Sequence, residues 1–514
     1  MYLTQALHRW ASATPAGVAT ACGERVRTFA ETRERVSRLA GGLRRIGVAH
    51  EDRVGILSLN SDRYIESLFA IPWADGVLNP VNIRWSPTEI AYSLEDSQTR
   101  VLIVDDVFAQ AVPAVQAIYP GLRTVIHAGD GPTPDFAISY EELITESEPT
   151  GDACRSGDDL AGIFYTGGTT GAPKGVMLTH ANLVSAALGG LASGSFFRHG
   201  VTPRSLHVAP MFHLADFAFF LMTSIGGGAN IAVPMFDPEN VLELIGTQSV
   251  TDTLLVPTMI QMLADHPKAS AYDMSSLRTI VYGASPISPA LLGRAQTAWP
   301  TVDFVQAYGM TELAALATIL PAADHSDGTR QRSAGQMAPI SEVRIADGDG
   351  TNVPHGVVGE IWVRGPQVMR GYWHKPQETT EALQNGWMRT GDAGYLDEDG
   401  YLYIVDRLKD MIITGGENVY SSEVENALAQ HKAVAACAVI GLPDERWGER
   451  VHAVIVRATH SSVTAAELQV HTRNLIAGYK VPRSVSFVDA LPISGAGKIL
   501  KRSLRDTIES SSPS

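Results

Sequence analysis

Residues able to bind phosphate are concentrated between Tyr165 and Gly175, where the chain reads Tyr-Thr-Gly-Gly-Thr-Thr-Gly-Ala-Pro-Lys-Gly. The glycines allow backbone N–H groups to converge on an oxyanion, the threonine hydroxyls add donors, and Lys174 adds a point charge. The segment differs from a Walker A loop, because Lys174 follows Pro173 and no Ser or Thr comes next. A glycine-rich surface hairpin is the alternative, but the hydroxyls and the lysine together favour a phosphate loop.

A second group of candidate residues is Tyr308-Gly-Met-Thr-Glu312, which places an aromatic ring, a hydroxyl and a carboxylate within five residues. The ring of Tyr308 can lie against an adenine, and the carboxylate of Glu312 is a hard oxygen ligand suited to Mg²⁺. Taken alone, the same pattern is typical of an ordinary strand end followed by a helix start. Together with a phosphate loop it favours nucleotide binding.

Four isolated polar residues allow both a structural and a functional interpretation. His213 lies in an apolar stretch, where a lone histidine is more often a core residue, and Asp216 nearby is expected to cap or hydrogen-bond a loop, with a substrate contact as the alternative. Asp392 ends the turn Arg-Thr-Gly-Asp, where aspartate usually serves the turn itself. Lys498, in a glycine-rich segment, is either a flexible tail lysine or a cation that stabilises negative charge on a phosphoryl group.

The elements expected to position these residues alternate between helices and strands. Thr28 and Glu31 form a predicted capping box, after which apolar residues recur at helical spacing as far as Gly47. Short apolar runs then predict buried strands, which implies parallel sheets covered by helices. The predicted strands lie at 54–58, 101–104, 125–126, 160–164, 176–178, 254–257 and 279–282.

The residue pattern changes after about Glu342. Short segments of alternating polarity, separated by turn residues, predict a small β-rich subdomain over 342–406. Helix and strand alternate again from Arg407, which predicts a small, mobile α+β domain over 407–514. The fold class is therefore α/β, with a large N-terminal domain over 1–406. A length of 514 residues agrees with about three domains or subdomains.

Composition excludes several classes of protein. Hydrophobic residues at 45% and charged residues at 18% are typical of a globular protein, and a net charge of −15 disfavours nucleic acid as a partner. Three widely spaced cysteines form neither a disulfide framework nor a zinc site, which favours a reducing, cytoplasmic setting. We expect no signal peptide and no integral membrane segment, because the most apolar stretch, 208–236, is interrupted by polar residues and three consecutive glycines.

The segment Tyr165–Gly175 strongly resembles the phosphate loop of the adenylate-forming superfamily, which contains acyl-CoA synthetases, peptide-synthetase adenylation domains and firefly-type luciferases. The resemblance recurs in order along nearly the whole chain, and such a series of motifs with family-like spacing is very specific. The further motifs are Ala209–His213, Tyr282–Pro286, Gln306–Glu312, Gly386–Asp392, Asp406–Asp410, Gly415–Asn418 and Gly497-Lys498.

The resemblance implies a role for each matching residue. It assigns Tyr308 to adenine, Thr311 to the α-phosphate, Asp392 with Arg407 to the ribose, and Lys409 to a hinge. Lys498 would be the catalytic cation; here Ala496 stands where the family usually has threonine, which removes one hydroxyl and keeps the charge. The implied ATP- and AMP-binding residues are Thr166, Gly167, Gly168, Thr169, Thr170, Gly171, Lys174, Gly283, Ala284, Ser285, Gln306, Ala307, Tyr308, Gly309, Met310, Thr311, Asp392, Arg407 and Lys498.

The resemblance also implies metal, acyl and CoA sites. Thr166 and Glu312 would hold Mg²⁺, and His213, with a catalytic role beside the acyl carboxylate, would line the acyl pocket with Phe217, Tyr282 and Gly283. A pocket of this kind discriminates by size, since burying a methylene contributes about 0.8 kcal/mol. The expected substrate is therefore a medium- or long-chain fatty acid or an aromatic acid, not acetate or an amino acid. The CoA-binding residues would be Gly415, Gly416 and Glu417.

The activity implied is that of an AMP-forming acyl-CoA synthetase using ATP, Mg²⁺ and CoA. A carboxylic acid reacts with ATP to give an acyl-adenylate and pyrophosphate, and the CoA thiol then displaces AMP. A stand-alone adenylation enzyme that loads a carrier protein would share every ATP motif and is one alternative. A non-catalytic nucleotide-binding regulator is another, against which the presence of both Lys498 and Glu312 argues. A homodimer is an oligomeric state left open.

Overall fold

The computed structural model describes residues 1–166, 172–325, 328, 330–444, 446–459, 461–492 and 499–511. The chain divides into two compact units. Unit 1 comprises Met1–Val343 and Val363–Met388, and unit 2 comprises Arg344–Trp362 and Arg389–Ser514. Within the described part of the chain, no helix is both long enough and apolar enough to cross a membrane.

One sheet of unit 1 has eight strands and carries the candidate phosphate loop at one side. The strands β8, β4, β3, β5, β6 and β7 run parallel, whereas β9 and β19 are antiparallel additions beyond β8. The parallel pairing agrees with the predicted alternation of helices and strands. In sheet order the strands are β19 (Gly371–Tyr372), β9 (Lys174–Thr179), β8 (Leu160–Thr166), β4 (Val77–Pro80), β3 (Arg53–Leu57), β5 (Val101–Val104), β6 (Thr124–His127) and β7 (Ile138–Ser139).

Helices with well-defined starts accompany this sheet. The predicted capping box of Thr28 and Glu31 is confirmed, with Thr28 Oγ1 accepting from Glu31 N and the Glu31 carboxylate accepting from Thr28 N. Ser86 and Glu89 form a second box. The helices of this part are α1 (Gln5–Ala13), α2 (Phe29–Arg45), α3 (Asp62–Trp73), α4 (Pro87–Asp96), α5 (Asp106–Ala109), α6 (Val112–Ile118) and α7 (Tyr140–Thr145).

The second sheet of unit 1 has nine strands, and its central strands β11, β10, β12, β13 and β14 are parallel. Two further strands, β15 and β16, continue it in the antiparallel sense beyond β14. In order the strands are β16 (Gln336–Met337), β15 (Thr318–Leu320), β14 (Asp303–Tyr308), β13 (Thr279–Gly283), β12 (Asp252–Leu255), β10 (Arg204–His207), β11 (Ala229–Ala232), β1 (Val18–Cys22) and β2 (Arg25–Thr28).

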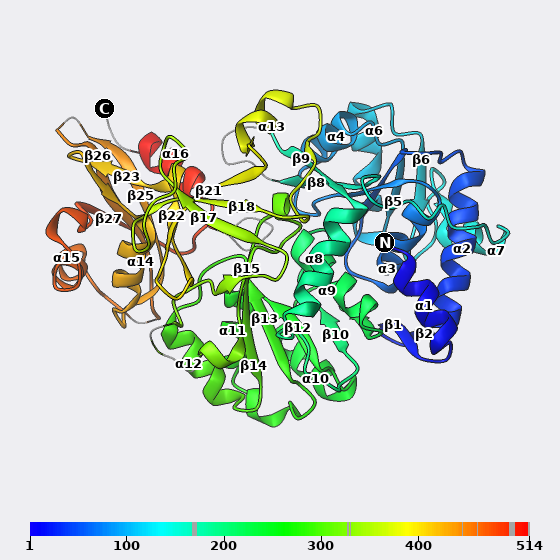
Figure 1. Ribbon diagram of the computed structural model, residues 1–514, viewed down its shortest axis with the longest axis horizontal. Coiled ribbons are helices and arrows are strands. Elements are labelled where there is room, and N and C mark those ends of the chain that lie inside the picture. The colour runs from blue at the N-terminus through cyan, green and yellow to red at the C-terminus, as the bar shows by residue number, and fades with distance from the viewer. Residues whose placement is uncertain are drawn as a thin grey trace. The chain divides into compact units, whose positions relative to one another are not determined.

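Two helices, α8 (His180–Ala192) and α9 (Leu214–Ile225), lie between the two large sheets (Figure 1). Helix α8 contacts β9 of the first sheet, and α9 contacts β10 and β11 of the second. Three more helices bury apolar residues against the second sheet in one large core: α10 (Pro238–Thr247), α11 (Pro257–Ala264) and α12 (Pro289–Ala298).

The remaining strands, which begin where the sequence predicts a β-rich region, form two five-stranded sheets. The first contains β17 (Glu342–Ala346), β18 (Gly359–Arg364), β20 (Leu383–Gln384), β21 (Trp387–Leu396) and β22 (Leu402–Arg407), with α13 (Pro376–Ala382) before β20. The second contains β23 (Ile412–Thr414), β24 (Glu417–Val419), β25 (Val434–Asp444), β26 (Gly448–Arg457) and β27 (Ser484–Val488). The helices α14 (Ser421–Ala429), α15 (Ala465–Arg473) and α16 (Lys501–Ser511) complete unit 2.

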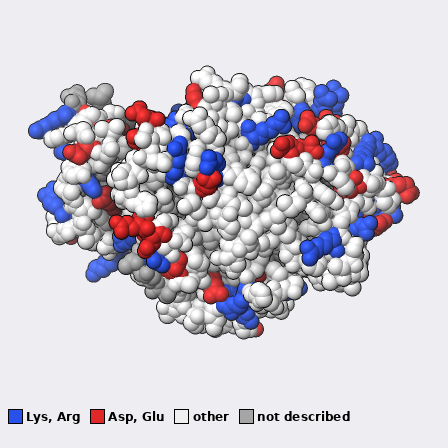
Figure 2. Space-filling model, in the orientation of Figure 1, with Lys and Arg blue, Asp and Glu red and all other residues white. Residues whose placement is uncertain are grey.

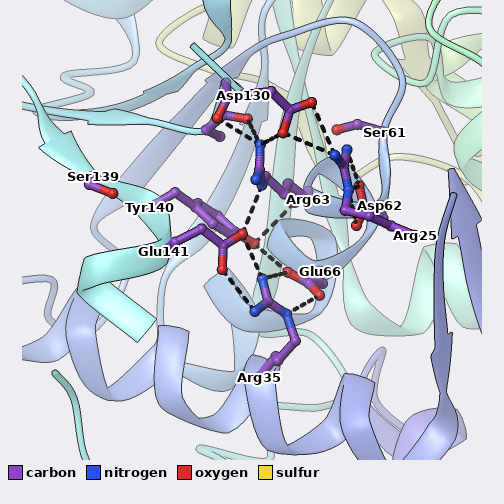
Figure 3. Close-up of polar contacts among 12 residues, drawn as sticks. Arg25, Arg35, Ser61, Asp62, Arg63, Glu66, Asp130, Ser139, Tyr140 and Glu141 are labelled. Carbon is purple, nitrogen blue, oxygen red and sulfur yellow. Dashed lines mark hydrogen bonds and ion pairs between the residues drawn. The ribbon is translucent and has the colours of Figure 1, made fainter. Parts of the chain in front are cut away.

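Charges on the face drawn in Figure 2 form small groups of mixed sign, without a continuous basic area among the described residues. Unit 1 also contains a network of buried charges (Figure 3). The carboxylate of Glu66 has no exposed surface and accepts from Arg35 Nε at 2.6 Å and from the Tyr140 hydroxyl at 3.0 Å, and it forms an ion pair with Arg27 Nε at 3.1 Å. Burial raises the pKa of Glu66, while Arg35 acts in the opposite direction.

We predict that Glu66→Ala destabilises the protein by about 3–5 kcal/mol, because it removes a buried counter-charge and leaves Arg27 with Asp62 alone and Arg35 with the partly exposed Glu141 alone. Urea unfolding followed by tryptophan fluorescence measures the change. Arg38→Ala is the matched control, since its pair with Glu34 at 2.7 Å is exposed and such pairs contribute at most about 1 kcal/mol. Equal midpoints for the two variants would contradict this view of the network.

Candidate active site

The two ends of the candidate phosphate loop face each other across a pair of strands. Thr166 ends β8 and Lys174 begins β9, and the two residues are antiparallel partners. The Thr166 hydroxyl lies 3.4 Å from the Lys174 carbonyl oxygen. The predicted flanking strands are confirmed, whereas the loop candidates themselves lie outside the described residues. These are Gly167, Gly168, Thr169, Thr170 and Gly171.

A tyrosine that sequence reasoning missed lies between two of the predicted residues. The Tyr372 hydroxyl donates to Glu312 Oε1 at 2.8 Å, and the Lys174 ammonium lies over the Tyr372 ring, 5.0 Å from its centre. Both Tyr372 and Glu312 are buried. Burial and the neighbouring Glu312 carboxylate raise the pKa of Tyr372, so its hydroxyl remains a donor. The only sequence signal was an aromatic run, Tyr372-Trp373, ahead of a short helix.

The turn after β14 folds tightly back on itself. Its backbone N–H groups at Leu313 and Ala315 both donate to Met310 O, and Ala317 N donates to Tyr308 O at 2.7 Å. Ala314 and Ala315 have φ of 46° and 71°, a left-handed conformation that non-glycine residues rarely adopt. The turn therefore holds Tyr308–Glu312 in a backbone path that local propensity does not favour.

The ends of β13 and β14 bring two predicted segments side by side. Their parallel register pairs Tyr282 with Gln306 and Gly283 with Ala307. Ala284, which follows β13, has φ of 66°. The candidates 283–285 and 306–308 thus share the carboxyl edge of a parallel sheet, where open α/β sheets bind ligands.

Glycine at position 283 allows β13 and β14 to pack closely, whether or not a ligand binds there. A Cβ built at this position would lie 2.5 Å from the carbonyl oxygen of Ala307, a backbone atom that cannot move aside. Enlarging Gly283 would therefore displace the strand that carries Gln306 and Tyr308. A larger residue at position 283 is consequently no clean test of the acyl pocket, because it would disturb the nucleotide segment too.

Tyr282 has a polar partner that the sequence did not suggest. Its buried hydroxyl lies 2.9 Å from His325 Nε2 and 3.4 Å from Gln306 Oε1. His325 Nδ1 lies 2.9 Å from the carbonyl oxygen of Pro321, to which it donates, so Nε2 accepts from the tyrosine. Burial lowers the pKa of His325 and raises that of Tyr282, which keeps both groups neutral.

The loop before His213 is clamped by Asn60, which sequence reasoning also missed. Asn60 Nδ2 donates to the carbonyl oxygens of His207 and Ala209, at 3.1 and 2.8 Å, and its Oδ1 accepts from Met211 N at 2.8 Å. The Asn60 side chain is buried with its amide fully engaged in these bonds, so the loop path is well determined. His213 itself is half-buried and caps α9 by position.

Aromatic side chains gather around the start of α9. The rings of Phe212 and His213 are 4.0 Å apart between centres. Phe217 is fully buried, 5.4 Å from the ring of Phe164 on β8 and 5.8 Å from that of Phe220. The start of α9 therefore packs into a buried aromatic wall, made of Phe164, Phe217 and Phe220.

Asp216, for which a loop contact was expected and a substrate contact left open, binds a buried histidine. Its Oδ2 lies 3.0 Å from His207 Nδ1, and His207 Nε2 lies 3.0 Å from Asn230 Oδ1. All three side chains are buried. Asp216 thus ties the first turn of α9 to β10 and β11, where a carboxylate near a helix N-terminus is also electrostatically favourable.

In unit 2, the two predicted ribose residues pair with each other. Asp392 on β21 and Arg407 on β22 are antiparallel partners, and Arg407 Nε forms an ion pair with Asp392 Oδ1 at 3.1 Å. The predicted hinge Lys409 follows in a short 3₁₀ turn, Leu408–Asp410, and is exposed. Lys498 lies outside the described residues.

The segment just before the predicted hinge is tied to the helices of unit 2. Asp406 Oδ2 accepts from Ser421 N at 2.5 Å and from Ser421 Oγ at 2.6 Å. Lys501 Nζ donates to Ser421 Oγ at 2.5 Å and pairs with Glu425 at 2.8 Å. This chain of contacts joins β22, α14 and α16.

The predicted CoA-binding residues form a tight hairpin between β23 and β24. Gly415 and Gly416 have φ of 62° and 83°, as a two-residue turn with both central residues left-handed requires. A Cβ at Gly415 would lie 2.8 Å from the ring of Trp447, so glycine also allows the indole to pack close. Arg446 and Arg483 lie near that ring, at 4.8 and 4.6 Å.

Among the described residues, no group of three or more His, Cys, Asp or Glu side chains is arranged to hold a metal ion. The oxygens of Glu312 and Thr166 nevertheless suit Mg²⁺, which keeps several waters and usually takes only one or two carboxylates together with substrate phosphates. The donor set present thus fits a magnesium ion that arrives with a nucleotide.

Two family models match the chain. The AMP-binding enzyme model matches residues 7–373, and the AMP-binding enzyme C-terminal domain model matches residues 423–498. The chain therefore belongs to the AMP-binding enzyme family, within the adenylate-forming superfamily. Together with its CoA ligase relatives, this membership identifies it as an AMP-forming acyl-CoA synthetase.

Similar proteins cover nearly the whole length of the chain. A feruloyl-CoA synthase from Amycolatopsis is 41% identical over 500 residues, covering 97% of each chain. A fatty acid–acyl-carrier-protein ligase, ScoC from Streptomyces coeruleorubidus, is 37% identical, covering 96% of this chain and 93% of that protein. The solved structure of o-succinylbenzoate CoA synthetase from Bacillus subtilis, with an acyl-adenylate, has a TM-score of 0.86 at 30% identity and covers 98% of both chains.

We predict that Gly309→Ala lowers the rate of acyl-adenylate formation at least about tenfold, equivalent to about 1.4 kcal/mol. A Cβ at this position would lie 2.3 Å from the carbonyl oxygen of Ala315 and 2.6 Å from the backbone N of Leu316, so the turn carrying Thr311 and Glu312 must shift. Pyrophosphate release measures the rate.

Gly293→Ala is the control for that variant, because a Cβ at position 293 in α12 meets no atom within 4 Å. It should leave the rate unchanged. Wild-type pyrophosphate release by Gly309→Ala would show that the turn tolerates a side chain and that its close backbone packing is not needed for adenylation.

Proposed function

We propose that this enzyme activates a substituted aromatic carboxylic acid of the hydroxycinnamate kind, and medium- or long-chain fatty acids less efficiently, as CoA thioesters. The observation that carries the proposal is the 41% identity to a feruloyl-CoA synthase over 97% of both chains. The aromatic wall around Phe217 supports an acid with a flat apolar body. Relatives named as fatty acid ligases, at 36–37% identity, support the second substrate class.

Binding of ATP is assigned to the residues that the family resemblance implies. Tyr308 lies against the adenine, flanked by 283–285 and 306–307, and Thr311 donates to the α-phosphate. The phosphate loop from Thr166 to Lys174 binds the remaining phosphates. The Asp392 carboxylate accepts from the ribose hydroxyls, and its contact with Arg407 at 3.1 Å holds it in one orientation. Carboxylate acceptors of this kind are favoured by charge-assisted hydrogen bonding.

Magnesium belongs to this proposal because the oxygen ligands of Glu312 and Thr166 suit it. Bound with ATP, the ion would neutralise phosphate charge. The protein's own contributions are the Lys174 ammonium at the end of the phosphate loop and the Lys498 ammonium, which offsets the repulsion between the attacking carboxylate and the α-phosphate. His213 lies beside the acyl carboxylate in this assignment.

The acyl pocket is assigned to His213, Phe217, Tyr282 and Gly283. An apolar pocket separates acids by size, because each buried methylene contributes about 0.8 kcal/mol, whereas it offers little to an acid as short as acetate. The second half-reaction then follows rotation about Lys409, which presents the hairpin Gly415–Glu417 to CoA. The thiol attacks the acyl carbonyl, and AMP leaves.

A second candidate differs only in the acceptor. The 37% identity to a fatty acid–acyl-carrier-protein ligase favours, as the alternative, transfer to the pantetheine of a carrier protein. The adenylation step would be unchanged. Comparing thioester formation with free CoA and with a carrier protein separates the two candidates.

We expect ferulate-like acids to be activated at least about a hundredfold more efficiently than acetate or an amino acid, since several methylene equivalents of apolar area are buried. Pyrophosphate release over a panel of aromatic, fatty, short and amino acids, with and without CoA, measures kcat/KM for each. A preference for acetate or an amino acid would overturn the pocket assignment and leave the family membership intact.

We predict that Lys498→Ala slows acyl-adenylate formation by on the order of a hundredfold or more, because its cation is needed while phosphate charge is redistributed. Thioester formation from supplied acyl-adenylate should be nearly unchanged. Lys268→Ala, which removes an exposed lysine paired with Glu239, is the control. Equal losses in both half-reactions would contradict the assignment of Lys498 as the cation of the adenylation step.

A further inference from the structure

Tyr372 touches both of the charged groups of unit 1 to which nucleotide binding is assigned above. Its hydroxyl donates to Glu312 Oε1 at 2.8 Å, and its ring faces the Lys174 ammonium at 5.0 Å. A cation over an aromatic face and a carboxylate accepting from a phenol are both favourable contacts. A single side chain thus binds a positive group through its ring and a negative group through its oxygen.

The backbone around Tyr372 is held on three sides. Strand β19 pairs with β9, with Tyr372 opposite Val176, and Trp373 N donates to Gly175 O at 2.7 Å. Tyr372 N donates to the Thr379 hydroxyl at 2.9 Å. Met369 N donates to the carbonyl oxygen of Glu312 at 2.8 Å. The segment 369–373 therefore connects the strand after the phosphate loop directly to the turn that carries Glu312.

We infer that Tyr372 is a positioning residue for the metal–nucleotide site, which keeps Lys174 and Glu312 apart and oriented before ATP binds. Both side chains contact Tyr372 and carry opposite charges, so without the tyrosine between them they are free to attract each other as an ion pair. With Lys174 held on the ring and one Glu312 oxygen held by the hydroxyl, the ammonium stays available for phosphate and the other carboxylate oxygen for the cation. The inference rests on the roles proposed above for Lys174 and Glu312.

Tyr372→Phe isolates the hydroxyl, because it keeps the ring beneath Lys174 and removes only the bond to Glu312. Partners that orient a metal ligand typically change metal affinity by about 10- to 100-fold when removed. We therefore expect the Mg²⁺ concentration that half-maximally enhances ATP affinity to rise about tenfold, while ATP affinity without Mg²⁺ is unchanged. Calorimetric titration of ATP at a series of Mg²⁺ concentrations, without any acid, gives both values.

Tyr372→Leu removes the ring as well, and ATP affinity in the absence of Mg²⁺ should then also fall severalfold, because Lys174 loses its support. Thioester formation from supplied acyl-adenylate should be nearly unchanged in both variants, since the pyrophosphate and its metal have already left. A failure of the proposed acid specificity would not alter these binding measurements, because no acid is present in them.

Tyr140→Phe is the matched control, since Tyr140 also is a buried tyrosine donating to a buried glutamate, Glu66, at 3.0 Å (Figure 3). It should lower the melting temperature at least as much as Tyr372→Phe and leave the Mg²⁺ dependence of ATP binding at the wild-type value. If Tyr140→Phe shifts that dependence equally, or Tyr372→Phe does not shift it, the inference is wrong.

A double variant keeps the test decisive if Tyr372→Phe proves poorly stable. If the tyrosine acts through Glu312, adding Tyr372→Phe to Glu312→Gln should leave the Mg²⁺ dependence of Glu312→Gln unchanged. Additive shifts in the double variant would mean that Tyr372 affects the site by another route, and would overturn the inference.

Discussion

The site of unit 1 depends on backbone packed directly against backbone at the edge of the nine-stranded sheet. At Gly309 a Cβ would lie 2.3 Å from the carbonyl oxygen of Ala315, and at Gly335 it would lie 2.0 Å from that of Ile319. The chain can reverse from β14 into β15 and β16 only because these positions lack side chains. That reversal places Thr311 and Glu312 beside the end of the parallel strands and forces Ala314 and Ala315 into the left-handed region.

Buried charge is used in two different ways in unit 1. The network around Glu66 and Asp62 joins α3 to β2, α2 and α7, since each carboxylate there has guanidinium partners. The pair of Asp216 and His207 instead fixes the start of α9, the helix that carries Phe217. The first supports the scaffold, and the second supports the wall of the proposed acyl pocket. Breaking either leaves a buried polar group without its partner.

Polar contacts also hold the strands and helices of unit 2 together. Asp392 and Arg407 face each other across β21 and β22, and Asp406, which precedes Arg407 on β22, is bonded to Ser421 of α14. Lys501 extends this chain of contacts to α16. These contacts join β22, which precedes the hinge candidate Lys409, to α14 and α16, which follow it, so a rotation about Lys409 would have to break them.

Periodicity and local motifs were sufficient to predict the capping box of α2, the parallel strands, the β-rich region after Glu342 and the strands flanking the phosphate loop, because these depend on residues close in the chain. The order of the motifs along the chain was sufficient to identify the family. Asn60, His325 and Tyr372 were not predictable, because each acts on residues far away in sequence: Tyr372 is 60 positions from Glu312. That Asp216 pairs with His207, and that a side chain at position 283 would meet the carbonyl oxygen of Ala307, depends on distant backbone segments that only the tertiary structure brings within a few ångströms of one another.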